Sequence, residues 1–119
     1  MDREQALNAF WNGFCEAYDE NTVPEDAVLP RITYEVAVDE FNNPVSMTAS
    51  IWDRSRSWAS VTALCHTIED VLRGGGKIVR YDTGAIWIKA GTPFAQRMSD
   101  PDDTIRRIVL NIEAEYIGG

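Results

Sequence analysis

The sequence predicts an α+β domain, with an antiparallel or mixed sheet of about five strands and two helices packed on one face of it. Two observations indicate this class. Two segments carry apolar residues at helical spacing, and five segments alternate apolar with polar residues, in the order α-β-β-α-β-β-β. The chain has 119 residues, of which 45% are hydrophobic, so residues 1–119 are expected to form a single domain with one core.

The first helix is predicted over residues 3–19. Its apolar residues recur at spacings that place them on one helical face: Leu7, Phe10, Trp11, Phe14 and Tyr18. Residues 20–30, which follow, are mainly polar. Pro24 and Pro30 fix their own φ angles and disfavour regular structure in this segment.

A pair of antiparallel strands is predicted next. Alternate residues of 32–38 are apolar, residues 41–44 (Phe-Asn-Asn-Pro) have turn chemistry, and the alternation resumes over 45–51. One face of the sheet is therefore expected to lie beneath the helices. The other face is expected to be solvated or to contact a partner, and it carries polar side chains from these strands and the last strand: Thr33, Glu35, Ser46, Thr48, Ser50, Asn111, Glu113 and Glu115.

The second helix is predicted to begin after Ser55 or Ser57, both suitable N-cap residues, and to run to about Arg73. Gly74–Gly76 are expected to end it, because glycine adopts positive φ angles without steric penalty. The inward stripe of this helix comprises seven residues: Trp58, Val61, Leu64, Cys65, Ile68, Val71 and Leu72.

The rest of the chain is predicted to form a hairpin, an irregular loop and a long strand. Lys77–Tyr81 and Ala85–Lys89 flank a short turn at residues 82–84, and the loop covers residues 91–103. The last strand directs alternate residues to the inner face: Ile108, Leu110, Ile112, Ala114 and Tyr116.

The charge is unevenly distributed along the chain. The formal net charge is −8 and the isoelectric point is near 4.5. Residues 1–50 hold ten acidic residues and two arginines, whereas residues 51–119 hold nine acidic and nine basic residues. This balance argues against general nucleic-acid binding and against docking on an anionic membrane, because both partners are negatively charged. The uneven distribution predicts a polarity of charge between two faces of the molecule.

The N-terminal residues and the cysteines indicate where the protein is made. The N-terminus is acidic and lacks the basic and apolar regions of a signal peptide, and no stretch of eighteen residues is continuously apolar. Cys15 and Cys65 each lie on a predicted helical stripe and are expected to be buried free thiols in a reducing compartment. These features predict a protein that is intracellular or assembled inside a cell.

Three motifs suggest chemistry, and none has the arrangement that the chemistry requires. Cys65 and His66 are adjacent on a helix, so their side chains point about 100° apart and cannot form a thiolate–imidazole pair. Gly74–Gly76 follow a helix, whereas a phosphate-binding loop opens one. The acidic residues of 100–103 lack the ligand spacing of a calcium loop. No catalytic residue, cofactor or metal site is therefore predicted, and the protein is not expected to be an enzyme.

A set of aromatic, basic and polar residues forms a candidate protein interface. Trp52 alternates with Ile51, and Trp87 alternates with Ile86 and Ile88, so both indoles should leave the inner face. Tryptophan and arginine are enriched in protein interfaces. The alternative is a tryptophan half-covered by a neighbouring loop. The candidate interface comprises Trp52, Arg54, Arg56, Arg80, Trp87, Lys89, Phe94 and Gln96.

Several of these segments resemble small proteins of the tail module of long-tailed phages and prophages. The resemblance spans about residues 30–117, and its most specific segment is GAIWIKAGTPFAQ at residues 84–96. Chain length and element order also look like the tail terminator group, whose members join tail to head. The segments that carry the resemblance are 51–58, 75–78, 84–89, 91–96 and 112–116. Ala90, Arg80-Tyr81 and the acidic residues 16–26 depart from it.

The resemblance implies a structural virion protein that is assembled in the host cytoplasm. It implies a hexameric ring of identical subunits that caps the tail tube and meets the head connector, with no enzymatic activity and no sequence-specific nucleic-acid binding. A ring needs two different contact surfaces on each subunit. Two alternatives remain at this point: a tail completion or neck protein of the same module, and a small intracellular ligand-binding or regulatory domain.

Overall fold

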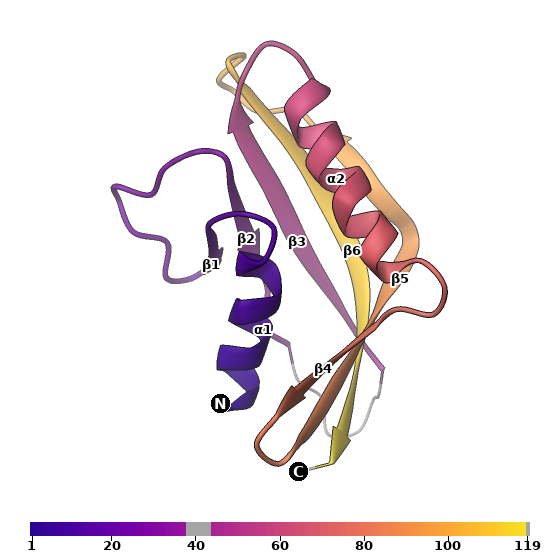
Figure 1. The fold of residues 1–119 in the computed structure, drawn as a ribbon. Helices are drawn as coiled ribbons and strands as arrows, with labels where there is room; N and C mark the ends of the chain where they lie inside the picture. Colours follow the sequence, from indigo (N-terminus) through magenta and orange to yellow (C-terminus); the bar gives the residue numbers. More distant parts are fainter. Residues whose placement is uncertain (38–43, 119) are drawn as a thin grey trace.

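The computed structural model describes residues 1–37 and 44–118, which form a curled six-stranded sheet with two helices on one face (Figure 1). The α+β class and the placement of both helices on one side are confirmed, with six strands in place of about five. The sheet order is β1-β2-β3-β6-β5-β4, and only the β1–β2 pair is parallel. The elements are α1 (Arg3–Asn12), β1 (Ala17–Asp19), β2 (Arg31–Tyr34), β3 (Val45–Arg54), α2 (Ala59–Leu72), β4 (Lys77–Tyr81), β5 (Gly84–Met98) and β6 (Ile105–Gly118).

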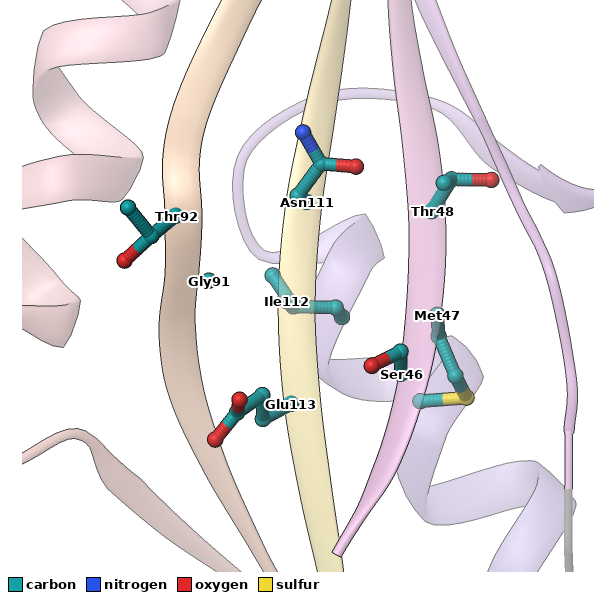
Figure 2. A pocket seen from close by; sticks show the side chains of 8 residues that line it. All are labelled: Ser46, Met47, Thr48, Gly91, Thr92, Asn111, Ile112 and Glu113. Carbon is teal, nitrogen blue, oxygen red and sulfur yellow. The ribbon is translucent and has the colours of Figure 1, made fainter.

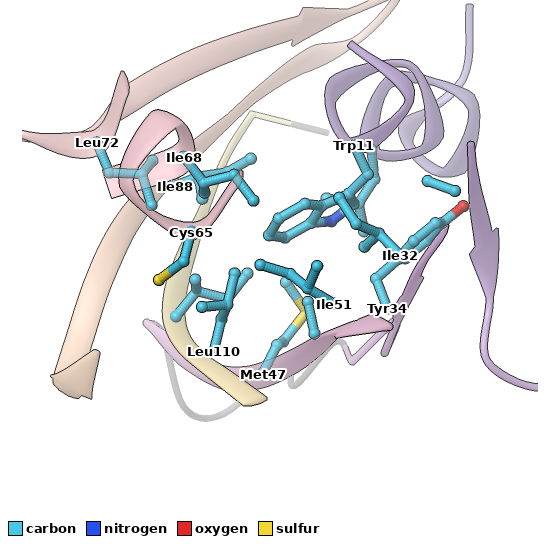
Figure 3. Close-up of a cluster of buried hydrophobic side chains, with 14 of the residues drawn as sticks. Trp11, Ile32, Tyr34, Met47, Ile51, Cys65, Ile68, Leu72, Ile88 and Leu110 are labelled. Atoms are coloured by element: carbon cyan, nitrogen blue, oxygen red, sulfur yellow. The ribbon is translucent and has the colours of Figure 1, made fainter. Parts of the chain in front are cut away.

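The core lies between the helices and the concave inner face of the sheet (Figure 3). Trp11 is fully buried, and its ring stacks on that of Tyr34 in β2 with a centroid separation of 6.3 Å. The alternation predicted for β6 is confirmed, because Ile108, Leu110, Ile112 and Ala114 are all buried. Apolar residues of α2 cover the same face further along the strands: Val61, Cys65, Ile68 and Leu72.

Helix α1 contacts strands at both edges of the curled sheet, β1 and β2 on one side and β4 on the other. Asp2 begins the helix with a capping box, in which its carboxylate accepts from the Gln5 N–H at 2.8 Å. The Met1 ammonium lies 2.6 Å from the Asp82 carboxylate in the β4–β5 turn, and the Asp82 N–H donates to the Met1 carbonyl. The start of α1 is thereby fixed to the far edge of the sheet.

The prediction of a helix over residues 3–19 is wrong beyond Asn12, because the chain turns there and residues 17–19 form β1. The Asn12 side chain causes this change of direction. Its Oδ1 accepts from the Ala17 N–H at 3.1 Å, and its Nδ2 donates to the Ala17 carbonyl at 3.2 Å. Cys15 therefore lies in the turn and is only half-buried, and Tyr18 belongs to a strand.

The loop predicted over residues 91–103 is also largely wrong, because β5 continues to Met98. Gly91 and Pro93, which suggested a loop, fall within a β-bulge between Ala90 and Ala95. A Cβ at position 91 would lie 2.9 Å from the Asn111 carbonyl oxygen, so the close approach of β5 and β6 depends on glycine here.

Smaller differences concern the ends of elements. The strand predicted over 32–38 ends at Tyr34, and both Val38 and most of the predicted 41–44 turn lie outside the described residues. Helix α2 starts at Ala59 with Trp58 as its N-cap, so the prediction of Ser55 or Ser57 as N-cap is wrong, although the Ala59 N–H donates to the Ser57 hydroxyl at 3.1 Å. Gly74–Gly76 all have positive φ, and the Gly76 N–H donates to the Leu72 carbonyl, so the predicted helix end is confirmed.

Asn12→Ala is expected to lower the free energy of unfolding by about 1–3 kcal/mol, because the N–H of buried Ala17 loses its partner and the Ala17 carbonyl keeps only the longer bond from the Asn8 amide, at 3.4 Å. Urea unfolding measures this change. Asn21→Ala is the control, since its exposed side chain forms no hydrogen bond within the described residues, and it should change stability by less than about 0.5 kcal/mol. Equal stability of the two variants would contradict the role assigned to Asn12.

Candidate functional site

The convex outer face of the sheet, away from both helices, carries most of the candidate interface. Trp52 projects from this face, and its indole N–H donates to the Thr33 hydroxyl at 2.9 Å. The Arg107 guanidinium lies 4.4 Å from the centroid of the Trp52 ring and donates to the Ser50 hydroxyl at 3.1 and 3.2 Å. Thr33 and Ser50 are consequently only 9% and 5% exposed, so the expectation of a solvated face is wrong for these two residues.

Trp87 projects from the same face at the other end of the sheet. Its indole N–H donates to the Gly75 carbonyl at 2.6 Å, and the Lys89 ammonium lies 4.1 Å from its ring centroid. Lys89 also pairs with Glu115 across the strands at 3.4 Å. Trp52 and Trp87 therefore point outward, as predicted, and both are half-covered by neighbouring groups.

The eight candidate residues do not form one continuous patch. Trp52 lies opposite Arg107 and Trp87 opposite Glu115, so the two indoles are eight residues apart along β6, about 26 Å. Arg54 and Arg56 lie near the β5–β6 loop, where they pair with Asp102 at 3.4 Å and Asp103 at 3.6 Å.

The other candidates belong to β4 and β5. Arg80 and Gln96 are exposed, whereas Phe94 packs against the core. The structure thus brings Arg80, Trp87 and Lys89 to the hairpin, and it places Phe94 and Gln96 on the distant part of β5.

A polar hollow of about 200 Å³ lies at the β5 bulge (Figure 2). The Asn111 amide donates to the Pro93 carbonyl at 2.8 Å at this point. The sequence did not indicate this hollow, because Gly91 and Pro93 suggested a loop and concealed the pairing with β6. The lining residues are Ser46, Met47, Thr48, Gly91, Thr92, Asn111, Ile112 and Glu113.

Two arginines that the sequence did not single out enclose Trp58 at the start of α2. The guanidinium carbons of Arg97 and Arg106 lie 4.7 and 5.4 Å from the centroid of the Trp58 ring. Arg106 also donates to the Arg56 carbonyl at 2.9 Å and to the Asp103 carbonyl at 2.8 Å. This cluster fixes the β3–α2 connection against the end of the β5–β6 hairpin.

Neither cysteine has the surroundings of a reactive thiol. Cys65 is buried in the core and the adjacent His66 is exposed, so they face different environments. Burial, with smaller contributions from Glu16 and Asp53, raises the pKa of the Cys15 thiol to about 11. Among residues 1–37 and 44–118, no three His, Cys, Asp or Glu side chains are grouped as metal ligands. No helix in the same residues has the length and apolarity needed to cross a membrane.

Comparison with known proteins identifies a relative in fold. The chain is similar to a chain in the structure of the virion of a native gene transfer agent particle, with a TM-score of 0.65 and 18% sequence identity. The match covers 97% of this chain and 91% of the other. The likeness is one of fold. No protein-family model and no curated protein sequence matches the chain.

Cys15 is expected to react slowly with iodoacetamide, because only the thiolate is nucleophilic. A pKa of about 11 in place of 9.0 leaves about a hundredfold less thiolate at pH 8, and the rate should still rise between pH 9 and pH 10. Peptide mass spectrometry distinguishes labelling at Cys15 from labelling at Cys65. The urea-unfolded chain is the control, and equal rates at pH 8 in the folded and unfolded chains would contradict the assignment.

Proposed function

We propose that this chain is a structural subunit of a phage-like particle, and more narrowly a tail terminator-like protein at the head–tail junction. The observation that carries the proposal is the likeness in fold, over almost the whole of both chains, to a component of a gene transfer agent virion. The match covers 97% of this chain and 91% of the other, so it extends over the domain and is not confined to one motif. Fold alone does not define function, so the sequence and surface must support the narrower role.

The sequence resemblance supports the tail-module assignment. Its most specific segment, residues 84–96, forms most of β5, the longest strand of the sheet. This segment contains the bulge, the close approach at Gly91 and the anchored Trp87, all of which depend on particular residues. The resemblance therefore concerns a part of the fold whose geometry depends on particular residues.

The narrower proposal is a non-enzymatic ring of identical subunits, six in number by resemblance, that contacts the tail tube on one side and the head connector on the other. The surface supports such contacts, since exposed arginines occupy one end of the sheet and the acidic residues that follow β1 form no ion pair with any residue the structure describes. A net charge of −8 also favours passage of DNA through a ring, because an acidic lumen repels phosphate.

Deletion of the gene from a particle-producing host tests the proposal. Loss of a terminator should leave heads separate from tails and tail tubes of abnormal length, because nothing stops tube growth. Unjoined tails of normal length would indicate the alternative role of tail completion or neck protein. Electron microscopy measures both outcomes, and mass spectrometry of wild-type particles should detect the chain. Normal particles after deletion would overturn the proposal.

Trp87→Ala is expected to impair assembly into particles while the subunit remains folded. The substitution removes an exposed hydrogen bond to Gly75, worth about 0.5–1.5 kcal/mol, and an outward aromatic surface. Trp87→Phe is the matched variant, since it keeps an aromatic ring without the N–H donor. Thermal unfolding checks the subunit, and loss of cooperative unfolding in Trp87→Ala would show that Trp87 belongs to the core.

A further inference from the structure

Strand β5 is paired on both sides along only part of its length. β4 pairs with Gly84–Ile88, whereas β6 pairs with β5 as far as Met98. Within the described part of the chain, no backbone group hydrogen-bonds to the other side of residues 89–98, which we term the open edge. In a strand paired on one side, alternate residues direct their N–H and C=O groups away from the sheet. The open edge therefore offers hydrogen-bonding groups to a partner.

The opposite edge of the sheet is closed. Asn12 takes up both the N–H and the C=O of Ala17, and the Asp19 carbonyl accepts from the Thr22 N–H at 2.9 Å. These three groups of β1 point away from β2, because the bonds between the two strands use alternate residues, among them Glu16 and Glu20. A second copy therefore cannot extend the sheet by adding a strand to β1, and any contact at this side must use side chains.

The open edge carries an unpaired positive charge and an exposed apolar side chain. Arg97 stacks on Trp58 but lies within ion-pair distance of no carboxylate among the described residues. Arg56 lies close to this site, because Arg106 contacts both Trp58 and the Arg56 carbonyl. Met98 is 42% exposed at the end of the strand. The surface thus fits an acidic partner that also has a small apolar group.

The loop after β1 has the complementary properties. Residues 20–28, which we term the acidic loop, contain Glu20, Glu25 and Asp26, all exposed and without an ion pair to any described residue. Val28 in the same loop is 62% exposed. The acidic loop adjoins β1 and the open edge belongs to β5, on opposite sides of the molecule (Figure 1). The two surfaces therefore match between copies and cannot meet within one copy.

We propose that the acidic loop of one copy docks on the open edge of the next copy. This proposal rests on the proposed function, because it names the contact between subunits of that assembly. Carboxylates of the acidic loop accept from outward N–H groups of β5 and pair with Arg97, while Val28 packs beside Met98. The contact joins unlike surfaces, so repeated copies form a closed ring or a filament and not a two-fold dimer.

Sedimentation velocity of the purified chain at 50 and 500 mM NaCl tests this contact. The wild-type chain should associate at low salt and dissociate at high salt, because the charged surfaces are solvent-exposed. Glu25→Gln with Asp26→Asn, and separately Arg97→Gln, should each raise the dissociation constant at least tenfold. The matched controls are Glu69→Gln with Asp70→Asn, and Arg73→Gln, which change the same charges on and beside α2 and should associate like wild type.

A mixture of the two impaired variants gives the sharpest result. Each retains one intact surface, so together they should form a one-to-one heterodimer and nothing larger. A wild-type chain that stays monomeric at low salt would overturn the proposal. So would association that is weakened by Arg97→Gln but left unchanged by Glu25→Gln with Asp26→Asn. Arg97→Lys keeps the charge and should associate, which separates loss of the ion pair from damage to the Trp58 cluster. Thermal unfolding of each variant confirms that it is folded.

Incorporation into particles separates this proposal from the proposed function. If particles contain the wild-type chain and accept both impaired variants equally well, the contact is wrong and the function stands. If the chain associates through these two surfaces but particles assemble normally without it, the contact stands and the function is wrong.

Discussion

The fold depends on the packing of the Trp11 indole inside the curl of the sheet. A curled sheet has a concave face whose apolar side chains must be covered at close-packed density. Trp11 is the largest fully buried side chain among the described residues, and it covers that face near the first two strands, where it stacks on Tyr34. Helix α1 also reaches β4, so one helix fills the curl and joins its two edges. Helix α2 then needs to cover only the remaining length of β3, β6 and β5.

The sequence predicted those parts of the fold that follow from local spacing. The alternation of buried residues in β6 and the end of α2 at its glycines could both be predicted, because each depends on residues that are neighbours in the chain. Strand β1 was not, since it forms through pairing of Ala17 with Ile32, fifteen residues away, and the spacing of Tyr18 also fits a helix. The second part of β5 was not predicted, because Gly91 and Pro93 disfavour strand structure. Pairing with β6 on both sides of the bulge outweighs this local preference.

The candidate site shows the same division. Strand alternation correctly directed Trp52 and Trp87 outward, but their covering groups come from distant segments, Arg107 through the strand register and Gly75 through the end of α2. The burial of Thr33 beneath Trp52 and of Ser50 beneath Arg107 could not be predicted from residue type. Arg97 and Arg106 were missed because their common partner, Trp58, was assigned to the inner stripe of a helix that starts one residue later.

The unequal edges of the sheet have a consequence for the behaviour of free subunits before assembly. A sheet with two open edges can grow without limit, since each added copy presents a fresh edge, and this is how cross-β aggregates elongate. Here the Asn12 side chain and the Thr22 N–H occupy three outward groups of β1, so strand addition is confined to the β4–β5 side of the sheet. Growth by strand addition therefore cannot continue from copy to copy, because an added copy presents only its blocked β1 edge. A single asparagine side chain thus works as a safeguard against runaway aggregation when the protein accumulates at high concentration.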